Sequence, residues 1–269
     1  GSSRSESTFW LYHALDRVGR EELWQDRESY RRNSTAHYLF YAVSKARVID
    51  LPGFTPFALD NSELLPCTNP VGRAEDSFGS ALTRYCRPDA IALELPVAIG
   101  HVQESLRARF PITSEAHLPR VNDFLREFTK RQLGASAAQD PGQRLALLAH
   151  VMRDLAGASV KDRIDHLREY LRFVQADIVD RLQRQLEATP DAPDYWQSDV
   201  RAIVQTNAKR LLAAGAAPRL AEWSQDIDAA GCADALSAEL DTMAAACEHW
   251  PALWRYAADE QARLLAGLC

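Results

Sequence analysis

The sequence of 269 residues lacks several features that would assign a class at once. It contains no run of about 18 apolar residues, so no membrane-spanning helix is expected. Its polar start, GSSRSES, has no apolar stretch, so no secretory signal peptide is expected there. HExxH, GxGxxG, Walker-loop and GxSxG motifs are missing too. Metalloprotease, dinucleotide-fold, P-loop and esterase interpretations therefore have no support.

The sequence also lacks an excess of basic residues and is poor in cysteine. Its 31 Lys and Arg against 37 Asp and Glu give a formal net charge of −6, which argues against a nucleic-acid binder that relies on a basic face. The five cysteines form no CxxC pair, and their number is odd. We therefore expect reduced thiols, no disulfide framework and no zinc knuckle. Reduced thiols indicate work in a cytosol, either the cell's own or a host's.

The second half of the sequence shows helical periodicity throughout. The clearest helix is predicted over residues 160–187, because apolar residues recur there every three or four positions and form one stripe. The stripe consists of Val160, Ile164, Leu167, Leu171, Val174, Ile178, Leu182 and Leu186. Asp140 and Pro141 are the expected N-cap and first residue of a preceding helix that Gly157 ends. Two or three more helices are expected over 220–268, with Trp223, Trp250 and Trp254 as core anchors.

The first half has a mixed α/β character. In PDAIALELPVAI (88–99), Ile91, Leu93, Leu95 and Val97 alternate with Ala92, Glu94 and Pro96. A period of two predicts a strand with one buried face, and the proline restricts that strand to an edge or an end. We therefore expect an α+β protein. A small mixed module of residues 1–112 would carry any catalysis, and an all-α array of residues 113–269 would pack against it and recognise a target.

Three polar features of the first half could form a site. Tyr12 and His13 follow the aromatic start of FWLYHAL. In YRRNSTAHYLFYAVS, Ser34 and Thr35 precede the tyrosines Tyr38 and Tyr41. Glu94 is a carboxylate within the predicted strand, where an unpaired charge would be costly if buried.

Together these features resemble the opening of the mono-ADP-ribosyltransferase superfamily, in its diphtheria-toxin and PARP branch. In that family the first strand ends in a Tyr-His or similar pair, and a Tyr-Ser-Thr segment leads into a second tyrosine. Here Tyr12-His13 stands at the first place, and Tyr30 and Tyr41, eleven residues apart, stand at the second.

The resemblance implies NAD⁺ as the substrate and no metal. It implies that His13 hydrogen-bonds the nicotinamide ribose and that Tyr38 or Tyr41 stacks on the nicotinamide ring. Tyr30, Ser34 and Thr35 would complete the binding segment. Glu94 would be the catalytic acid, stabilising the oxocarbenium-like charge as nicotinamide departs.

Each of these residues also has a purely structural interpretation. A histidine after a strand is commonly half-buried and hydrogen-bonded, and the tyrosine cluster suits core packing. Glu94 could pair with Arg84 or Arg87 on a solvated face. A further alternative is a thiol-hydrolase dyad of Cys67 or Cys86 with His13, His37 or His101, although neither cysteine has a family signature.

The leading expectation is therefore an effector-like bacterial enzyme that transfers ADP-ribose from NAD⁺ to a host protein, with ubiquitin and small GTPases as candidate targets. It would act in a host cytosol or in the cytoplasm, without a nucleic-acid or membrane partner. The alternative is a non-catalytic helical adaptor that docks a partner helix along the stripe from Val160 to Leu186.

Overall fold

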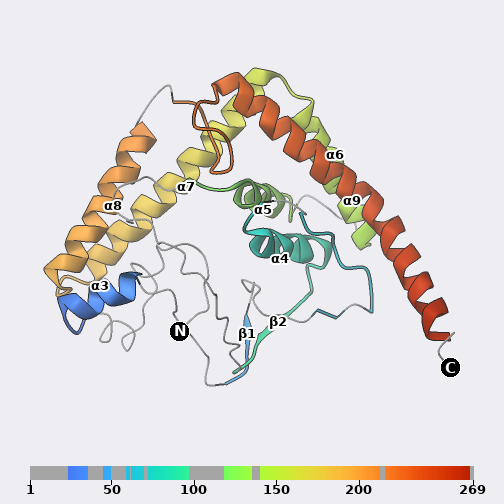
Figure 1. The fold of residues 1–269 in the computed structure, drawn as a ribbon, viewed down its shortest axis with the longest axis horizontal. Helices are drawn as coiled ribbons and strands as arrows, with labels where there is room; N and C mark the ends of the chain where they lie inside the picture. Colours follow the sequence, from blue (N-terminus) through green and yellow to red (C-terminus); the bar gives the residue numbers. More distant parts are fainter. Residues whose placement is uncertain are drawn as a thin grey trace. The chain divides into compact units, whose positions relative to one another are not determined.

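A computed structural model describes residues 24–35, 45–49, 59–60, 62–69, 72–96, 118–134, 140–212 and 216–266. The protein is mostly helical (Figure 1). Within the described residues, strands are confined to one antiparallel pair of three residues each. The α+β class is therefore not confirmed, because the described structure shows no small mixed module at the N-terminal end.

The chain forms two compact units. The first unit comprises Gly1–Gly53, Ile91–Leu118 and Glu169–Ala216, and the second comprises Phe54–Ala90, Pro119–Arg168 and Ala217–Cys269. Each unit draws segments from both sides of residue 112. The division into modules of residues 1–112 and 113–269 stays a prediction of the sequence.

In the first unit, α3 (Arg27–Thr35) and α8 (Asp194–Leu212) share a core with the C-terminal part of α7 (Val160–Ala188). Trp196 is almost fully buried in this core, and Trp24 meets it edge to face with ring centroids 5.2 Å apart. Aromatic pairs in this geometry add to the free energy gained from burial. The same unit holds the strands β1 (Arg47–Ile49) and β2 (Ala92–Glu94), in which Val48 lies opposite Leu93.

Helix α7 confirms the strongest prediction from the sequence. It spans Val160–Ala188, and the prolines at 190 and 193 follow its end as expected. Its stripe is largely covered by this chain, since Leu167, Leu171, Ile178 and Leu182 are all buried. Val160, at the start of the stripe, is 43% exposed, and the docking of a partner helix along the stripe stays a prediction.

The second unit contains α4 (Glu75–Cys86), α5 (Val121–Arg131), α6 (Pro141–Ala156) and α9 (Ala229–Ala266). Asp140 caps α6 as predicted, accepting a hydrogen bond from the Gln143 amide at 2.8 Å. The two or three helices expected over 220–268 are a single helix, α9, of 38 residues. Pro251 lies inside it without ending it, although a proline removes one backbone hydrogen bond.

Helices α6 and α9 pack along one another. At one end, Ser237 of α9 donates a hydrogen bond to the Ala156 carbonyl at 2.8 Å. At the other end, a Cβ placed on Gly142 would lie 3.8 Å from Pro251. The two helices are therefore antiparallel, and α6 begins level with Pro251. None of the helices in the described part of the chain is long and apolar enough to cross a membrane.

Candidate functional site

Tyr30 is a core residue of the first unit. Its side chain is 3% exposed and its ring lies 5.1 Å from that of Tyr195. Its hydroxyl donates a hydrogen bond to the Asp199 carboxylate at 2.7 Å. These two contacts pack α3 on α8, so Tyr30 has a structural role.

The other predicted NAD⁺-site residues are not brought together by the described structure. His13, Tyr38 and Tyr41 lie outside the described residues, and Ser34 and Thr35 are the last two residues of α3. Glu94 is the last residue of β2, opposite Arg47 in the register of the strand pair. The strand position of Glu94 is confirmed, while the catalytic role of Glu94 and His13 stays a prediction.

The strand pair corrects one expectation about burial. Ile91, Leu93 and Leu95 were expected on a buried face, yet they are 74%, 60% and 56% exposed. Val97 lies outside the described residues. A buried face requires a further layer of structure over the strands. A pair of three-residue strands has no such layer of its own.

Three buried cysteines meet in the second unit. Cys67, Cys86 and Cys247 come from the segment before α4, from α4 and from α9, and all are free thiols. Burial raises the pKa of Cys86 to about 12. A hydrogen bond between the Cys67 and Cys247 thiols lowers the pKa of the first and raises that of the second. Cys86 is thus held protonated at neutral pH, which speaks against its use as the nucleophile of a thiol hydrolase.

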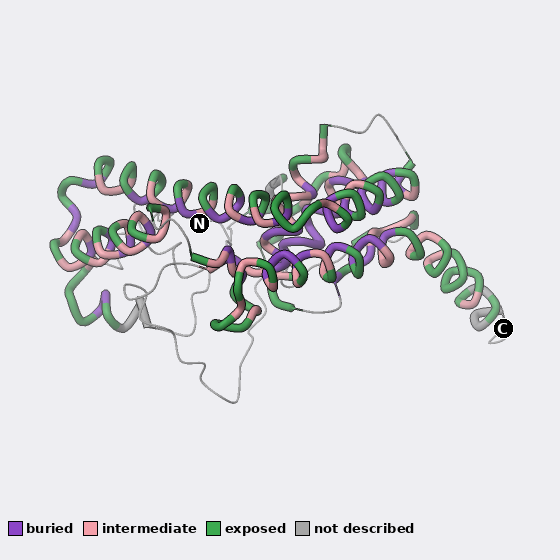
Figure 2. Tube along the Cα trace, turned by 90° about the horizontal axis from the view of Figure 1, so that it is seen from above, coloured by how far each residue is buried: buried purple, intermediate pink, exposed green. Residues whose placement is uncertain are grey.

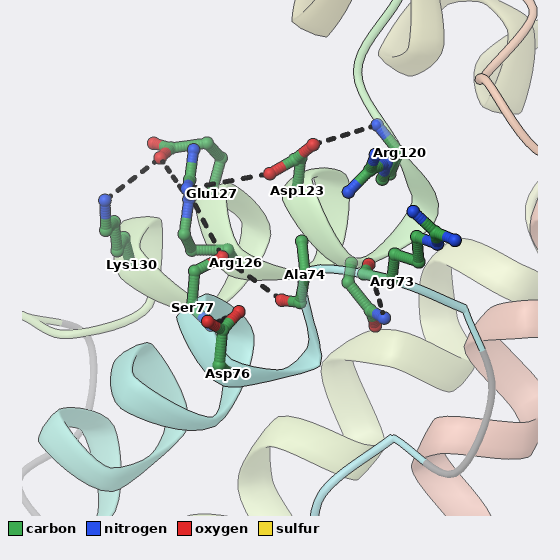
Figure 3. A network of polar contacts seen from close by, with 10 residues as sticks. Arg73, Ala74, Asp76, Ser77, Arg120, Asp123, Arg126, Glu127 and Lys130 are labelled. Atoms are coloured by element: carbon green, nitrogen blue, oxygen red, sulfur yellow. Dashed lines mark hydrogen bonds and ion pairs between the residues drawn. The ribbon is translucent and has the colours of Figure 1, made fainter. Parts of the chain in front are cut away.

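A polar network joins the starts of α4 and α5 (Figure 3). Asn122, fully buried, donates to the Arg73 carbonyl at 3.0 Å and accepts from Asn69 at 2.8 Å. Arg126 lies 3.6 Å from Asp123 and 3.3 Å from Glu127, which also binds Lys130 at 3.0 Å. Charges of opposite sign face one another within the network. We therefore interpret the network as a structural contact that holds the two helices together.

The clearest candidate for a functional surface is the end of α9. Residues 252–266, named here the α9 overhang, continue the helix beyond the start of α6 (Figure 1). At 1.5 Å per residue the overhang is about 22 Å long. Figure 2 shows residues 252–261 of it in the colours of exposed and intermediate residues, whereas the part of α9 beside α6 also carries buried residues.

A heptad pattern runs through α9 and into the overhang. Positions seven residues apart form two rows, which are Leu240, Cys247, Trp254 and Gln261, and Leu236, Met243, Trp250, Ala257 and Leu264. Both rows are apolar except for Gln261 at the end of the first. The first four heptad residues, Leu236, Leu240, Met243 and Cys247, are almost completely buried. In the overhang, Ala257 is exposed, Trp254 is half-buried, and the flanking Leu253 is 56% exposed. The heptad pattern is thus covered along its first half and more exposed in the overhang, at Trp254 and Ala257.

A charged flank accompanies this stripe. Arg153 of α6 binds Glu248 with two hydrogen bonds of 2.8 Å and 2.5 Å and lies 3.6 Å from Asp241. The hydrogen bond from Arg153 lowers the pKa of Glu248. The next residue in this seven-residue series is Arg255, which is exposed and forms no ion pair with another described residue. The sign of the flank therefore changes from acidic to basic beyond the level at which α6 begins.

The heptad pattern of this surface is visible in the sequence. Whether its second half is covered depends on where α6 begins. Trp250 and Trp254 were expected as core anchors, and both are only partly buried, with ring centroids 6.2 Å apart. Trp250 donates from its indole nitrogen to the Leu65 carbonyl at 2.6 Å and so belongs to the packed part of the unit. Trp254, one turn further on, lies beyond the cover that α6 provides.

Metal chemistry finds no support in the described residues, where no group of three or more His, Cys, Asp or Glu side chains could hold an ion. No protein-family model, curated protein or solved structure matches this chain.

Proposed function

We propose that this chain is a helical protein-interaction protein that binds an amphipathic helix along the α9 overhang. One observation carries the proposal: the heptad pattern of α9 continues past the start of α6, where Leu253 is 56% exposed, Ala257 is exposed and Trp254 is only half-buried. Burying a large apolar side chain stabilises a complex by about 1.5–3 kcal/mol relative to leaving it exposed. Leu253 and Trp254 both offer such a gain.

Helix α6 indicates what kind of helix the overhang accepts. Its buried face towards the unit core is built from leucine, alanine and methionine, among them Leu145, Leu148, Ala149 and Met152. It meets the acidic flank of α9 with Arg153. A helix bound along the overhang would combine a similar apolar face with an acidic group for Arg255. This is recognition of an amphipathic helix through its apolar face.

Photo-crosslinking tests the proposal directly. A benzophenone amino acid is placed at Leu253, beside the apolar stripe, or at Ala252, which lies about 160° around the helix from Trp254. Leu253 should give a discrete adduct of higher mass in cells that encode the chain, and Trp254→Glu should abolish it. Ala252 should give none, although it is exposed. Equal labelling from both positions, or no adduct from Leu253, would contradict the proposal.

A second candidate function is the NAD⁺-dependent transfer of ADP-ribose to a host protein such as ubiquitin or a small GTPase, in a host cytosol or in the cytoplasm. It is favoured by one observation, the position of Glu94 on β2. The resemblance requires a carboxylate borne on a strand. Release of nicotinamide from NAD⁺ by the purified chain, and its loss in Glu94→Gln, would support this candidate.

A further inference from the structure

We infer that Cys67 and Cys247 of the second unit form a site of oxidative modification, at which a hydroperoxide converts the two thiols into one disulfide. The inference goes beyond the proposed function and does not depend on it. Both thiols are free in this structure, so the described state is the reduced one. Three features support the site: the course of the segment that carries Cys67, the contact between the two thiols, and the surroundings of the remaining cysteines.

The segment before α4 runs antiparallel along α9. The indole nitrogen of Trp250 donates a hydrogen bond to the Leu65 carbonyl at 2.6 Å. A Cβ placed on Gly142 would lie 3.8 Å from Pro251 and 3.9 Å from Leu64. Leu64 is therefore level with Pro251, and Leu65 with Trp250. These contacts set the register of the segment on α9 without involving a sulfur atom.

The same register brings the two thiols together. Cys67 follows Leu65 by two residues, and Cys247 precedes Trp250 by about one helical turn. The Cys247 thiol donates a hydrogen bond to the Cys67 sulfur, and this bond lowers the pKa of Cys67. A disulfide requires sulfur atoms about 2.05 Å apart, and two thiols in hydrogen-bond contact reach this distance by a short approach.

The remaining buried cysteines are poorer partners. Cys86 lies beside the pair, but burial raises its pKa to about 12, so its thiol stays protonated. The end of α4 that carries Cys86 is held by Arg144, which donates to the Tyr85 carbonyl at 3.0 Å. Cys232 is as buried as Cys247 and lies on the same helix, but fifteen residues away, about four turns. The fold therefore selects Cys67 and Cys247 as the pair.

Burial of both thiols selects a small, uncharged oxidant. Cys67 is 3% exposed and Cys247 is fully buried, so an oxidant as large as a disulfide-linked peptide has no access to them in the folded chain. Hydrogen peroxide is small enough to enter when the irregular segment before α4 opens locally.

The reaction needs one peroxide and no further reactant. The Cys67 thiolate attacks one peroxide oxygen, the O–O bond breaks, and a sulfenic acid and one water form. The Cys247 sulfur then attacks the Cys67 sulfur, and the sulfenic oxygen leaves as a second water with the Cys247 proton. Two thiols and one hydrogen peroxide thus yield one disulfide and two waters, with two electrons passing from sulfur to oxygen.

Peroxide treatment of the full chain tests the pairing. A Cys269→Ser background keeps the four cysteines that the structure shows buried. The folded chain is treated with hydrogen peroxide, free thiols are alkylated in urea, and unreduced peptides are identified by mass spectrometry. Cys67 and Cys247 should be linked within one chain, and Cys86 and Cys232 should be alkylated. No link between Cys67 and Cys247, or an equal yield of a link to Cys86, would overturn the inference.

Oxidation of the unfolded chain is the matched control. In urea, cysteines close in the sequence should be linked, Cys67 with Cys86 and Cys232 with Cys247, because shorter loops close at a lower cost in entropy. A link between Cys67 and Cys247 of the same yield in urea would show that the fold does not select this pair, and would overturn the inference.

Two alanine variants test the order of attack. Cys247→Ala should keep a sulfenic acid on Cys67, which dimedone traps once the chain is unfolded, because the thiol that displaces the oxygen is missing. Cys232→Ala, at an equally buried position of the same helix, should form the disulfide as the native chain does. Loss of the disulfide in Cys232→Ala, or no dimedone adduct on Cys67 in Cys247→Ala, would overturn the inference.

Discussion

Arg153 of α6 donates hydrogen bonds from Nε and Nη2 to the two carboxylate oxygens of Glu248 on α9, at 2.8 Å and 2.5 Å. A bidentate pair fixes direction as well as distance. It therefore helps to set the register in which α6 begins level with Pro251. The α9 overhang and its open apolar stripe follow from this register.

Substitutions along α9 should separate the covered stripe from the open one. Leu240→Ala should lower the free energy of unfolding by about 2–5 kcal/mol, because it leaves a cavity beside α6. Trp254→Ala in the dilute chain should lower it by less than about 1 kcal/mol, as is usual for a side chain outside the core. Urea denaturation followed by circular dichroism measures both. A loss at Trp254 as large as that at Leu240 would show that Trp254 belongs to the core.

Tyr30→Phe should destabilise the first unit. The variant keeps the ring beside Tyr195 but removes the donor to Asp199, and a hydrogen bond to a charged group contributes about 1.5–3 kcal/mol. Tyr195→Phe is a matched control, since its hydroxyl donates only to the Trp24 carbonyl, at 3.1 Å. Its loss should therefore be smaller. If Tyr30→Phe kept full stability but lost NAD⁺ binding, the site interpretation of Tyr30 would replace the core interpretation.

The buried thiol of Cys86 should make the protein less stable at alkaline pH. The unfolded chain releases this proton near pH 9, whereas the folded chain holds it to about 12. Between these values the unfolded state binds fewer protons, so the free energy of unfolding falls as pH rises, by about 1.4 kcal/mol per pH unit for one group. Urea midpoints between the two values measure the slope. Cys86→Ala should reduce the slope, and an unchanged slope in that variant would contradict the assignment.

The transferase candidate makes a prediction of its own. NAD⁺ at a hundred times its dissociation constant should raise the free energy of unfolding by about 2.7 kcal/mol, and thermal unfolding would register the shift. His13→Ala should abolish this protection if His13 binds the nicotinamide ribose. No shift with millimolar NAD⁺, together with no release of nicotinamide, would remove this candidate and leave the interaction protein.

Local signals in the sequence predicted the helices α6 and α7 well. The Asp140-Pro141 cap and the stripe from Val160 to Leu186 act within a few residues, and both predictions are confirmed. Pairings between distant residues could not be predicted in the same way. Tyr30 is held in the core by a hydrogen bond from its hydroxyl to Asp199, which lies 169 residues further along the chain.

The same distinction explains the errors about exposure. Periodicity shows which side chains share a face, but only the neighbouring element decides whether that face is covered. Leu93 is exposed because the described strand pair has no layer over it, and the overhang is open because α6 begins at Pro141. Whether the end of α9 is exposed therefore depends on the relative lengths of α6 and α9. These relative lengths cannot be predicted from the pattern of either helix alone.

Hydrogen exchange along α9 tests the account most directly. In the dilute chain, amides of residues 232–250 should exchange slowly, because opening them costs the packing against α6, and amides of the overhang should exchange fast. Slow exchange of the overhang in the dilute chain, equal to that of residues 232–250, would show that the chain already covers this stripe and would contradict the account.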